Sequence, residues 1–557
     1  MSTLLAPRPP AARSRITWEP TQTLGFVRAV LRRLGSDQRI AVAIAIVASL
    51  LSGWNLFNAP EYQDDEGTYT AQAFAIFDGK LAPYTYWYDH APLGWIQLAG
   101  MSWLPPLLGQ GNQTHVGQMR CVVAVFFVAS TVMVYLIARR LGLKQTFAVL
   151  AAGLFCLSPL SLVLGRQVFI DNIGLPWLLM AFYLLLSPRL KLWNHIGAAA
   201  CFAIAVLSKE TLAILGPALL VALLHRPNWK TRFFSLMGFL SVGGLLLSFF
   251  PLIAVLRGEL LSGPGHVSLE DAVIYQLFSR PGSGSLLDSH SGRADLVNGW
   301  MYYDKYLILA GLVAAGFCLL RRETRWIPVG LLLLAGPVVV GQGYLPAMYI
   351  IAAIPFLVLA VAATADLAWR CLLLLVSAVP SQGRHAKGTR RAGLGARIAA
   401  LGLTGGAALT VITVLLLPQW LPMDRALLTS NQNADWEHAL NWAKSNIPRQ
   451  DAVLVPYSMW QDVNADGGRG PWQAIALEKM DLDTEFVVHH PEGWHAIRWI
   501  IEGPPTGRNI KNLELTNAGL ALQHSKVVAA FGDWKIRSVV VDQGGTQTQS
   551  PPPGNTR

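Results

Sequence analysis

Charge is scarce in this sequence of 557 residues. Only 14% of the residues are Asp, Glu, Lys or Arg, against roughly 25% in an average soluble domain. Hydrophobic residues make up 53% of the chain, and the mean hydropathy is +0.39. Apolar runs such as 40–54 and 401–417 recur along the chain and cannot all be buried in one water-surrounded core. The composition therefore excludes a soluble globular enzyme and predicts a polytopic membrane protein.

Cysteine is scarce as well. The five cysteines lie in or beside apolar runs, and none follows Cys371. A disulfide framework and a CxxC metal motif are both missing, which argues against redox chemistry and structural zinc. The net charge of +11 would suggest nucleic acid in a soluble protein, but in a membrane protein the distribution of cations among the loops matters more. We expect no nucleic-acid partner.

Apolar runs bounded by charge or by Gly and Pro predict about eleven transmembrane helices. They lie near 38–57, 117–138, 146–164, 174–187, 195–208, 211–224, 234–256, 305–320, 326–343, 347–371 and 398–418. When alternate loops up to residue 418 are assigned to opposite sides, 24 Lys and Arg residues fall on one side and 8 on the other. The positive-inside rule then predicts a cytoplasmic N-terminal tail (1–37) and an extracytoplasmic C-terminal segment in the cell membrane.

The first outer loop, 58–116, is long, which is typical of loops that are functional or disordered. Ten aromatic residues between positions 58 and 103 argue against disorder, because so apolar a segment must pack. The rings either anchor the loop at the membrane interface or stack on sugar faces. The sequence leaves both alternatives open.

Three adjacent carboxylates, Asp64, Asp65 and Glu66, lie early in this loop. They repel one another, so at least one is expected to have a raised pKa, as a general base commonly does. The alternative is a solvated acidic helix start, with Asp64 as the N-cap of a helix over 65–77.

Tyr88, Asp89 and His90 follow in the same loop, shortly before Pro92. The proline suits the first turn of a helix whose N-terminal amides would face an anion. His90 could bind phosphate, donate a proton or ligate a metal. A simple Asp-His turn is the alternative.

Charges also interrupt the apolar runs at two outer positions. Arg166 and Asp171 stand at the membrane boundary, where an unpaired charge is costly, so each is expected to pair with the other or with a polar neighbour. Lys209 and Glu210 interrupt a stretch of about 30 apolar residues that is too long for one span. The chain must turn there, and the short arms place Lys209 near the depth of a lipid phosphate; a salt bridge between the two neighbours is the alternative reading.

Together these segments resemble the GT-C membrane glycosyltransferases that use a polyprenyl-phosphate sugar. The similarity is to the branch of lipid A aminoarabinose transferases and protein O-mannosyltransferases (glycosyltransferase family 39-like), and it covers roughly residues 38–225. The shared features are Asp65-Glu66, a segment at 88–93 similar to Tyr-x-Lys-Pro-Pro-Leu, the Arg166 to Asp171 loop, and the hairpin at 208–210. The departures are His90 in place of Lys, Ala91 in place of the first Pro, and Glu210 in place of Gly.

The resemblance implies inverting transfer of a sugar from a polyprenyl-phosphate donor to an extracytoplasmic acceptor: a lipid, a cell-wall polysaccharide or a protein. It implies Asp65 as the base and Asp171 as a second acid. It also implies three residues that bind the donor phosphate: Lys209, His90 and Arg166. Supporting roles fall to Asp64, Glu66, Asp89 and Tyr88. No cofactor is required by this chemistry, although a divalent metal held by Glu66, Asp89 and His90 stays an open alternative.

The chain changes character after residue 418, where charged residues, Pro and Gly become frequent. The pattern predicts helices at 435–447 and 509–522 and strands at 452–455, 485–488 and 536–541. We therefore expect a GT-C transmembrane domain at 38–418, a small outer α/β domain at 419–545 and a disordered tail at 546–557. Tyr457, Trp460, Asp462 and Trp472 could bind acceptor, although packing in the domain is the more ordinary role.

Two other functions compete with a glycosyltransferase. A transporter or lipid flippase would show ionisable groups near the bilayer midplane and an internal repeat of broken helices. The sequence has no clear repeat, and the Lys209-Glu210 pair lies on the outer side. A scaffold for the C-terminal domain would not explain the crowded acids and aromatic rings of the first loop.

Overall fold

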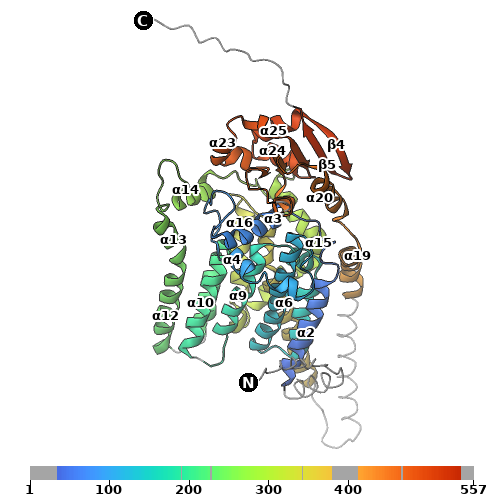
Figure 1. Ribbon diagram of the computed structural model, residues 1–557. Coiled ribbons are helices and arrows are strands. Elements are labelled where there is room, and N and C mark those ends of the chain that lie inside the picture. Colours follow the sequence, from blue (N-terminus) through green and yellow to red (C-terminus); the bar gives the residue numbers. More distant parts are fainter. Residues whose placement is uncertain are drawn as a thin grey trace, which may run out of the picture.

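The protein is a helical bundle with a small sheet domain at one end (Figure 1). The computed structural model describes residues 34–189, 191–225, 229–341, 343–378, 412–465 and 468–540. Most of the predicted N-terminal tail (1–37), the basic loop at 381–397, most of the predicted span at 398–418 and the predicted disordered tail at 546–557 lie outside these residues.

Helices occupy the other ten predicted spans. They are α2 (Ser36–Gly53), α6 (His115–Arg140), α7 (Gln145–Leu157) with α8 (Pro159–Gly165), α9 (Ile170–Leu185), α10 (Leu192–Ser208), η2 (Glu210–Leu215) with α11 (Gly216–His225), α12 (Trp229–Leu247) with α13 (Phe249–Arg257), α15 (Gly292–Cys318), α16 (Trp326–Val340), and η5 (Ala347–Ala352) with α17 (Ile354–Ala378). Among the described residues, five helical stretches are long and apolar enough to cross a membrane on their own, and a sixth span forms if the bent pair α7 and α8 is counted as one.

Helix ends follow the local sequence. The α6 helix starts at the Thr114 hydroxyl, which accepts the amide of Gly117, and ends on Arg139 and Arg140, whose charges suit a helix C-terminus. Between α7 and α8 the axis bends by 60° at Pro159, whose ring cannot continue the helix. Ser158 caps the new helix by accepting the amide of Ser161.

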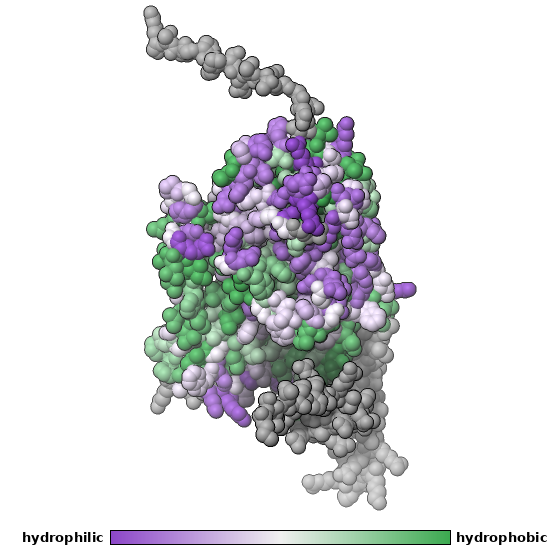
Figure 2. Space-filling view, viewed as in Figure 1, coloured by the Kyte–Doolittle hydropathy of each residue, from purple (hydrophilic) through white to green (hydrophobic). Residues whose placement is uncertain are grey.

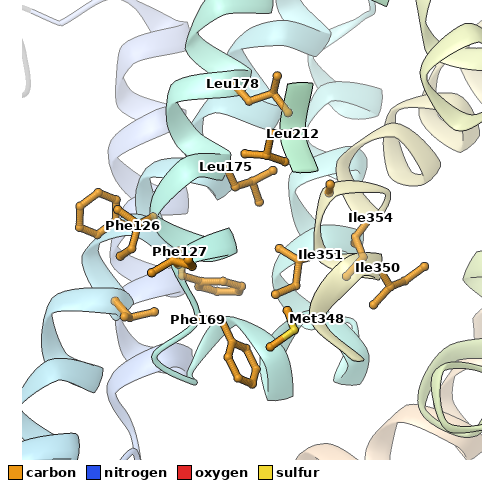
Figure 3. Close-up of a cluster of buried hydrophobic side chains, with 14 of the residues drawn as sticks. Phe126, Phe127, Phe169, Leu175, Leu178, Leu212, Met348, Ile350, Ile351 and Ile354 are labelled. Carbon is orange, nitrogen blue, oxygen red and sulfur yellow. The ribbon is translucent and has the colours of Figure 1, made fainter. Parts of the chain in front are cut away.

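The buried core of the bundle lies where α6, α9, η2, η5 and α17 meet (Figure 3). Its side chains are aliphatic and aromatic, and they include Phe126, Phe127, Phe169, Leu175, Leu178, Leu212, Met348, Ile350, Ile351 and Ile354. Leu212 and Leu215 are both buried and anchor the segment that follows Lys209. This core fixes the position of the charged break between α10 and η2.

The C-terminal domain contains a five-stranded mixed sheet in the order β2-β1-β3-β5-β4. The strands are β1 (Val453–Val455), β2 (Ala474–Ala476), β3 (Trp499–Glu502), β4 (Ser525–Phe531) and β5 (Trp534–Val539). β1 pairs in parallel with β2 and β3, whereas β5 is antiparallel to β3 and β4. Its helices are α20 (Ala434–Asn446), α21 (Tyr457–Ala465), α22 (Lys479–Leu482), α23 (Glu485–His489), η7 (Gly493–Ala496), α24 (Thr506–Asn512) and α25 (Thr516–Gln523).

The predicted α/β character of this domain is confirmed, with two corrections. Residues 485–489 form the helix α23, not a strand, because Phe486 packs into the domain core while Val487 and Val488 remain exposed. The predicted helix at 509–522 is two helices, α24 and α25, separated by Glu514, whose φ of 54° is incompatible with a continuous helix.

The distribution of apolar and polar side chains on the surface is that expected for a membrane protein with one polar end outside the lipid. Figure 2 shows apolar side chains over the part of the face formed by α12 and α13, and polar side chains over the C-terminal domain. Exposed side chains of α12 and α13 include Phe233, Phe234, Leu245, Phe249 and Leu256. Lipid is the solvent that such a surface requires.

Candidate active site

The three acids of the first outer loop begin the helix α3 (Asp64–Ala75). Carboxylates suit this position because they face the positive end of the helix dipole. Successive residues of a helix point about 100° apart, so the three side chains face three different surroundings. The helix start was predicted, but Gln63, not Asp64, is the N-cap.

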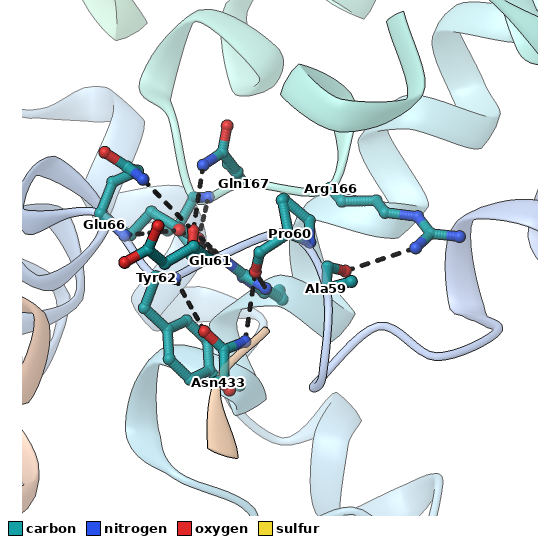
Figure 4. A network of polar contacts seen from close by, with 12 residues as sticks. Ala59, Pro60, Glu61, Tyr62, Glu66, Arg166, Gln167 and Asn433 are labelled. Atoms are coloured by element: carbon teal, nitrogen blue, oxygen red, sulfur yellow. Dashed lines mark hydrogen bonds and ion pairs between the residues drawn. The ribbon is translucent and has the colours of Figure 1, made fainter. Parts of the chain in front are cut away.

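Glu66 is a structural residue. Its oxygens lie 2.6 Å from Arg120 Nη2 and 2.8 Å from Arg120 Nε, and both side chains are fully buried. Glu66 also accepts the amide of Val168, and Arg120 donates to the carbonyls of Leu56 and Pro60. This polar network joins the first outer loop to α6 and to the loop before α9 (Figure 4).

Asp64 faces the C-terminal domain. One carboxylate oxygen accepts the amide of Ser458 at 3.1 Å, and the other lies 3.4 Å from Asn509 Nδ2. The pKa of Asp64 is raised by burial, and the hydrogen bonds from Ser458 oppose that shift. Asp64 therefore fastens the domain to α3.

Asp65 is the carboxylate that stays free for chemistry. It is open to solvent and makes no hydrogen bond with any residue that the structure describes. Its pKa is raised because nearby protein atoms weaken the hydration of the carboxylate. The positive charges of Lys209, His90 and Arg280 act in the opposite direction and lower the pKa. A carboxylate with a raised pKa beside cations has the character of a general base.

The cations beside Asp65 belong to a buried polar cluster at the break between α10 and η2. Lys209 has an extended backbone (φ −151°, ψ 106°) and a side chain that is only 3% exposed. Its Nζ lies 3.8 Å from Asp171 Oδ2 and 3.4 Å from His90 Nε2, while His90 Nδ1 is 2.9 Å from Glu210 Oε1. The predicted break at Lys209 is confirmed.

Asp171 and His90 reach Lys209 from the starts of two other helices. Asp171 lies in the first turn of α9, and His90 precedes α4 (Leu93–Gly100), which begins directly after Pro92 as the sequence predicted. Gly94 allows α4 to approach the bundle, since a Cβ there would lie 2.9 Å from the carbonyl oxygen of Ser208. Three of the side chains predicted to share a site, His90, Asp171 and Lys209, thus meet, and the charges of Lys209 and His90 act on the fourth, Asp65.

Tyr88 supports this arrangement. It has a left-handed backbone conformation (φ 57°), which is unfavourable for a bulky residue and is held by its surroundings. Its hydroxyl donates to Glu259 at 2.5 Å, and its ring packs 4.6 Å from that of Tyr86. The hydroxyl of Tyr86 donates to the carbonyl of His90. Asp89 lies between these two anchored residues and lines the cavity described below.

Arg166 lies outside this cluster. It is fully buried and donates to the carbonyls of Leu51, Ala59 and Leu427 (Figure 4 shows the Ala59 contact). It therefore pairs with polar backbone groups, not with Asp171, and its position does not suit the predicted contact with a donor phosphate. Its guanidinium compensates carbonyls at the ends of α2 and α19 (Leu417–Thr429).

The alternative metal site is not assembled. Glu66 is committed to Arg120, and both ring nitrogens of His90 face Lys209 and Glu210. Among the residues described, no three His, Cys, Asp or Glu side chains converge to hold a metal ion.

A cavity of about 350 Å³ lies beside α3, and its lining on that helix begins one turn after Asp65. On α3 it is lined by Thr68 and Gln72, which follow Asp65 on the same helix face. The rest of the wall comes from 82–89, from the segment containing Arg280, and from the C-terminal domain. Volumes of this size are typical of small-ligand sites.

Four charged side chains of this cavity were missed by the sequence analysis, and one of them is Asp271. Arg280 follows the π-helical turn η3 (Tyr275–Ser279), and its guanidinium lies 3.7 Å above the Tyr344 ring. Glu478 and Lys479 come from the C-terminal domain. None of them belongs to a local motif, because they meet α3 only through the tertiary fold.

An apolar groove of about 280 Å³ lies on the membrane side of the cluster. It is lined by side chains of α4, α10, α12 and α13: Leu93, Ile96, Ile204, Leu207, Phe249 and Phe250. Pro92 and Leu207 place one end of it within two residues of His90 and Lys209 along the chain. The site thus combines a cavity with charged and aromatic lining, a buried cation and a groove suited to hydrocarbon.

This chain is similar to a known protein family in sequence and to solved structures in fold. Residues 101–254 match the family model described as dolichyl-phosphate-mannose-protein mannosyltransferase. No curated protein matches the chain by sequence.

Solved structures of similar fold cover most of the chain. The structure of ArnT from Cupriavidus metallidurans bound to undecaprenyl phosphate is 15% identical and has a TM-score of 0.55, over 91% of this chain and 99% of that one. Its apo form gives 16% identity and a TM-score of 0.54, over 94% and 100%. The oligosaccharyltransferase from Archaeoglobus fulgidus in complex with Zn and sulfate gives 13% identity and a TM-score of 0.54, over 87% and 71%.

The expected fold is confirmed by these matches and by the architecture of the chain. The chain is a mostly helical membrane protein with the GT-C fold of the ArnT and protein mannosyltransferase type, and it carries a small C-terminal sheet domain.

Proposed function

We propose that this GT-C protein is an inverting glycosyltransferase that moves a sugar from a polyprenyl phosphate to an acceptor hydroxyl on the outer side of the membrane. The observation that carries the proposal is the position of Asp65. It is an accessible carboxylate with a raised pKa on which the charge of the buried Lys209 acts, and an apolar groove begins at Leu207, two residues before Lys209. A base, a cation for a phosphate and a groove for an isoprenoid are the three parts that the reaction needs.

The donor phosphate binds between Lys209 and Arg280. These are the two permanent cations whose charges act on Asp65, and stacking on Tyr344 holds the Arg280 guanidinium in place. A phosphate there offsets the desolvation of Lys209 better than Asp171 does at 3.8 Å. The isoprenoid chain then extends along the groove beside Leu207, where lipid-like surface is already exposed.

Transfer follows from this placement. Asp65 accepts the proton of the acceptor hydroxyl as the hydroxyl oxygen forms a bond to the anomeric carbon. The bond between that carbon and the phosphate oxygen breaks, and its electron pair leaves with the polyprenyl phosphate. Lys209 and Arg280 stabilise the charge that develops on the leaving group, a contribution worth several kcal/mol in enzymes of this kind. Attack opposite the phosphate inverts the anomeric centre.

The topology inferred from the charges is part of the proposal. The N-terminal tail lies in the cytoplasm, and the C-terminal domain lies outside the cell membrane. This orientation places Asp65 and the polar cavity on the outer face, where lipid-linked sugars and extracytoplasmic acceptors meet.

The test is the Asp65→Asn variant of the full chain in membranes. We expect normal abundance and thermal stability, because Asp65 makes no hydrogen bond with the described residues, but a loss of sugar transfer of at least about 100-fold, the scale of one general base. Asp78→Asn, an exposed carboxylate at the end of the same helical segment, is the matched control and should transfer normally. Normal turnover by Asp65→Asn would rule out the proposed base.

A further inference from the structure

Two neighbouring cavities lie between the first outer loop and the C-terminal domain. The inner cavity is the one beside α3, of about 350 Å³, and the outer cavity has a volume of about 900 Å³. Both are lined by residues 82–86 and by Val267. A ligand long enough to fill both would run from Asp65 outward along the face of the C-terminal domain.

The inner cavity carries the groups that bind sugar hydroxyls. The carboxylates of Asp89 and Glu478 line it and make no hydrogen bond with another residue among those the structure describes. Lys479 Nζ lies 3.7 Å above the ring of Trp87, which also lines the cavity. Carboxylates and an ammonium next to an aromatic ring match the alternating polar edges and apolar faces of a carbohydrate.

Glu478 is suited to a ligand whose groups both donate and accept hydrogen bonds. Burial and the nearby charge of Asp64 raise its pKa to about 7. Near neutrality, part of the population is therefore a carboxylic acid, which donates one hydrogen bond and accepts others. Hydroxyl groups offer both kinds of partner, whereas a phosphate or a carboxylate offers acceptors alone.

The outer cavity continues the same chemistry. Trp472 and His489 stack at 5.0 Å with an angle of 19° between their planes, and both line this cavity. Glu259 and Arg257, which form an ion pair of 2.7 Å, line it from the segment after α13. Paired charges and a stacked aromatic wall provide a surface for a neutral ligand.

The charges of the two cavities nearly balance. The acids are Asp89, Asp271, Glu478, Glu259 and Glu485, and the permanent cations are Arg280, Lys479, Lys80 and Arg257. A strongly anionic or cationic acceptor would find no matching surplus here. The apolar groove is lined by a separate set of residues.

We propose that these neighbouring cavities together bind a neutral oligosaccharide chain as the acceptor, with its terminal sugar held by Glu478 and Lys479 and the preceding sugars against Trp472 and His489. This inference rests on the proposed transferase function and names the acceptor class. The C-terminal domain then acts as the specificity wall of the active site. The terminal hydroxyl reaches Asp65 past Thr68, one turn along α3.

The test measures binding of neutral oligosaccharides to the full chain in lipid nanodiscs. The probes are linear manno- and arabino-oligosaccharides of one to four units, with Kd determined by calorimetry. In at least one series we expect the four-unit ligand to bind at least about tenfold more tightly than the single sugar. Absence of binding in both series, or affinity independent of length, would overturn the proposal.

Variants separate the two cavities. Glu478→Gln should weaken every length by about tenfold, because it alters the terminal-sugar site. Trp472→Ala should abolish only the increase in affinity with oligosaccharide length. His489→Ala tests the same side of the outer cavity without disturbing the core, because His489 is exposed. Glu492→Gln and Trp494→Ala are the matched controls, since Glu492 is exposed and Trp494 is a second tryptophan stacked on a histidine, and neither lines a cavity. Equal weakening by these controls would contradict the assigned site.

Binding of undecaprenyl phosphate, measured on the same samples, distinguishes a failure of the proposed acceptor class from a failure of the proposed transferase function. A protein that binds undecaprenyl phosphate through Lys209 but no oligosaccharide overturns the acceptor class alone. A protein that does not bind the lipid phosphate contradicts the transferase function itself. Preferential binding of a Ser- and Thr-rich peptide would replace the glycan with a protein acceptor and also overturn the inference.

Discussion

Adjacent residues of a helix point in different directions, and at the start of α3 this separates three chemically similar side chains. Asp64 binds the backbone of Ser458, Glu66 pairs with the buried Arg120, and Asp65 alone faces the cations of the site. From the sequence, we expected mutual repulsion of the three acids to raise a pKa. These separate environments matter more for the role of each carboxylate than that repulsion does. Position on the helix, not residue type, distinguishes the base from its neighbours.

At this scale we predict that Glu66→Gln destabilises the protein. The change leaves the Arg120 guanidinium buried without its counter-charge, and breaking such a pair costs about 3–5 kcal/mol. Thermal unfolding in detergent should show a clearly lower Tm than for the wild type, with Asp78→Asn unchanged. A Tm equal to the wild type together with lost transfer would instead make Glu66 a site residue.

The raised pKa of Asp65 predicts the pH dependence of transfer. A carboxyl is protonated below its pKa, and a protonated Asp65 cannot act as a base. Because its pKa lies above the ordinary value of 3.8, kcat/KM should begin to fall at a higher pH than a solvated aspartate would give. The acidic limb of the kcat/KM profile should move in Asp65→Glu and stay in place in Asp78→Asn. A profile identical in all three proteins would contradict this assignment.

At the scale of elements, the site depends on close contacts between backbones. Gly67 lies where α3 meets α21, and a Cβ there would fall 1.9 Å from the carbonyl oxygen of Tyr457. The contact lets Asp64 reach Ser458 and brings the C-terminal domain against the cavity. The interface between α3 and α21 thus helps to shape the proposed active site.

Gly67→Ala should therefore disturb the domain interface. The methyl group meets backbone that cannot rotate away, so the cost should reach or exceed the 1–3 kcal/mol typical of overpacking. Limited proteolysis should show faster cleavage of the C-terminal domain, and transfer should fall. Gly100→Ala is the control, because that glycine has open space around it; equal behaviour of the two variants would show that the interface tolerates separation.

Elements that depend on local sequence could be predicted, whereas elements that depend on tertiary contacts could not. The break at Lys209, the helix after Pro92 and the helix at the acids depend on local sequence, and the structure contains all three. The helix α23 was predicted as a strand because residues 485–488 are short and rich in valine, and only packing of Phe486 decides their conformation. Arg280 and Glu478 escaped prediction because tertiary contacts alone bring them to Asp65.

At the scale of the whole molecule, the fold separates two solvents. The apolar surface of α12 and α13 and the groove beside Leu207 face lipid, while the sheet domain covers the polar cavity at one end (Figures 1 and 2). The Lys209 cluster lies between them. A donor with a lipid tail and an acceptor from the aqueous side can therefore reach Asp65 by separate routes.

The proposed orientation predicts which side of the membrane each end occupies. A cysteine introduced at Asp533, in the exposed turn between β4 and β5, should react with a membrane-impermeant maleimide in intact cells. A cysteine at Arg322, exposed at the other end of the bundle after α15, should react only after permeabilisation. The native cysteines provide the background in the unmodified chain. The opposite pattern would invert the topology and remove the site from the outer face.

The central claim is that Asp65 and Lys209 face one polyprenyl phosphate. The most direct measurement is a structure of the full chain with bound undecaprenyl phosphate. We predict phosphate oxygens within hydrogen-bond distance of Lys209 Nζ and the Arg280 guanidinium, and the isoprenoid chain in the groove beside Leu207. A phosphate bound elsewhere, with Lys209 still paired to Asp171 and Asp65 out of reach of the lipid headgroup, would contradict the account.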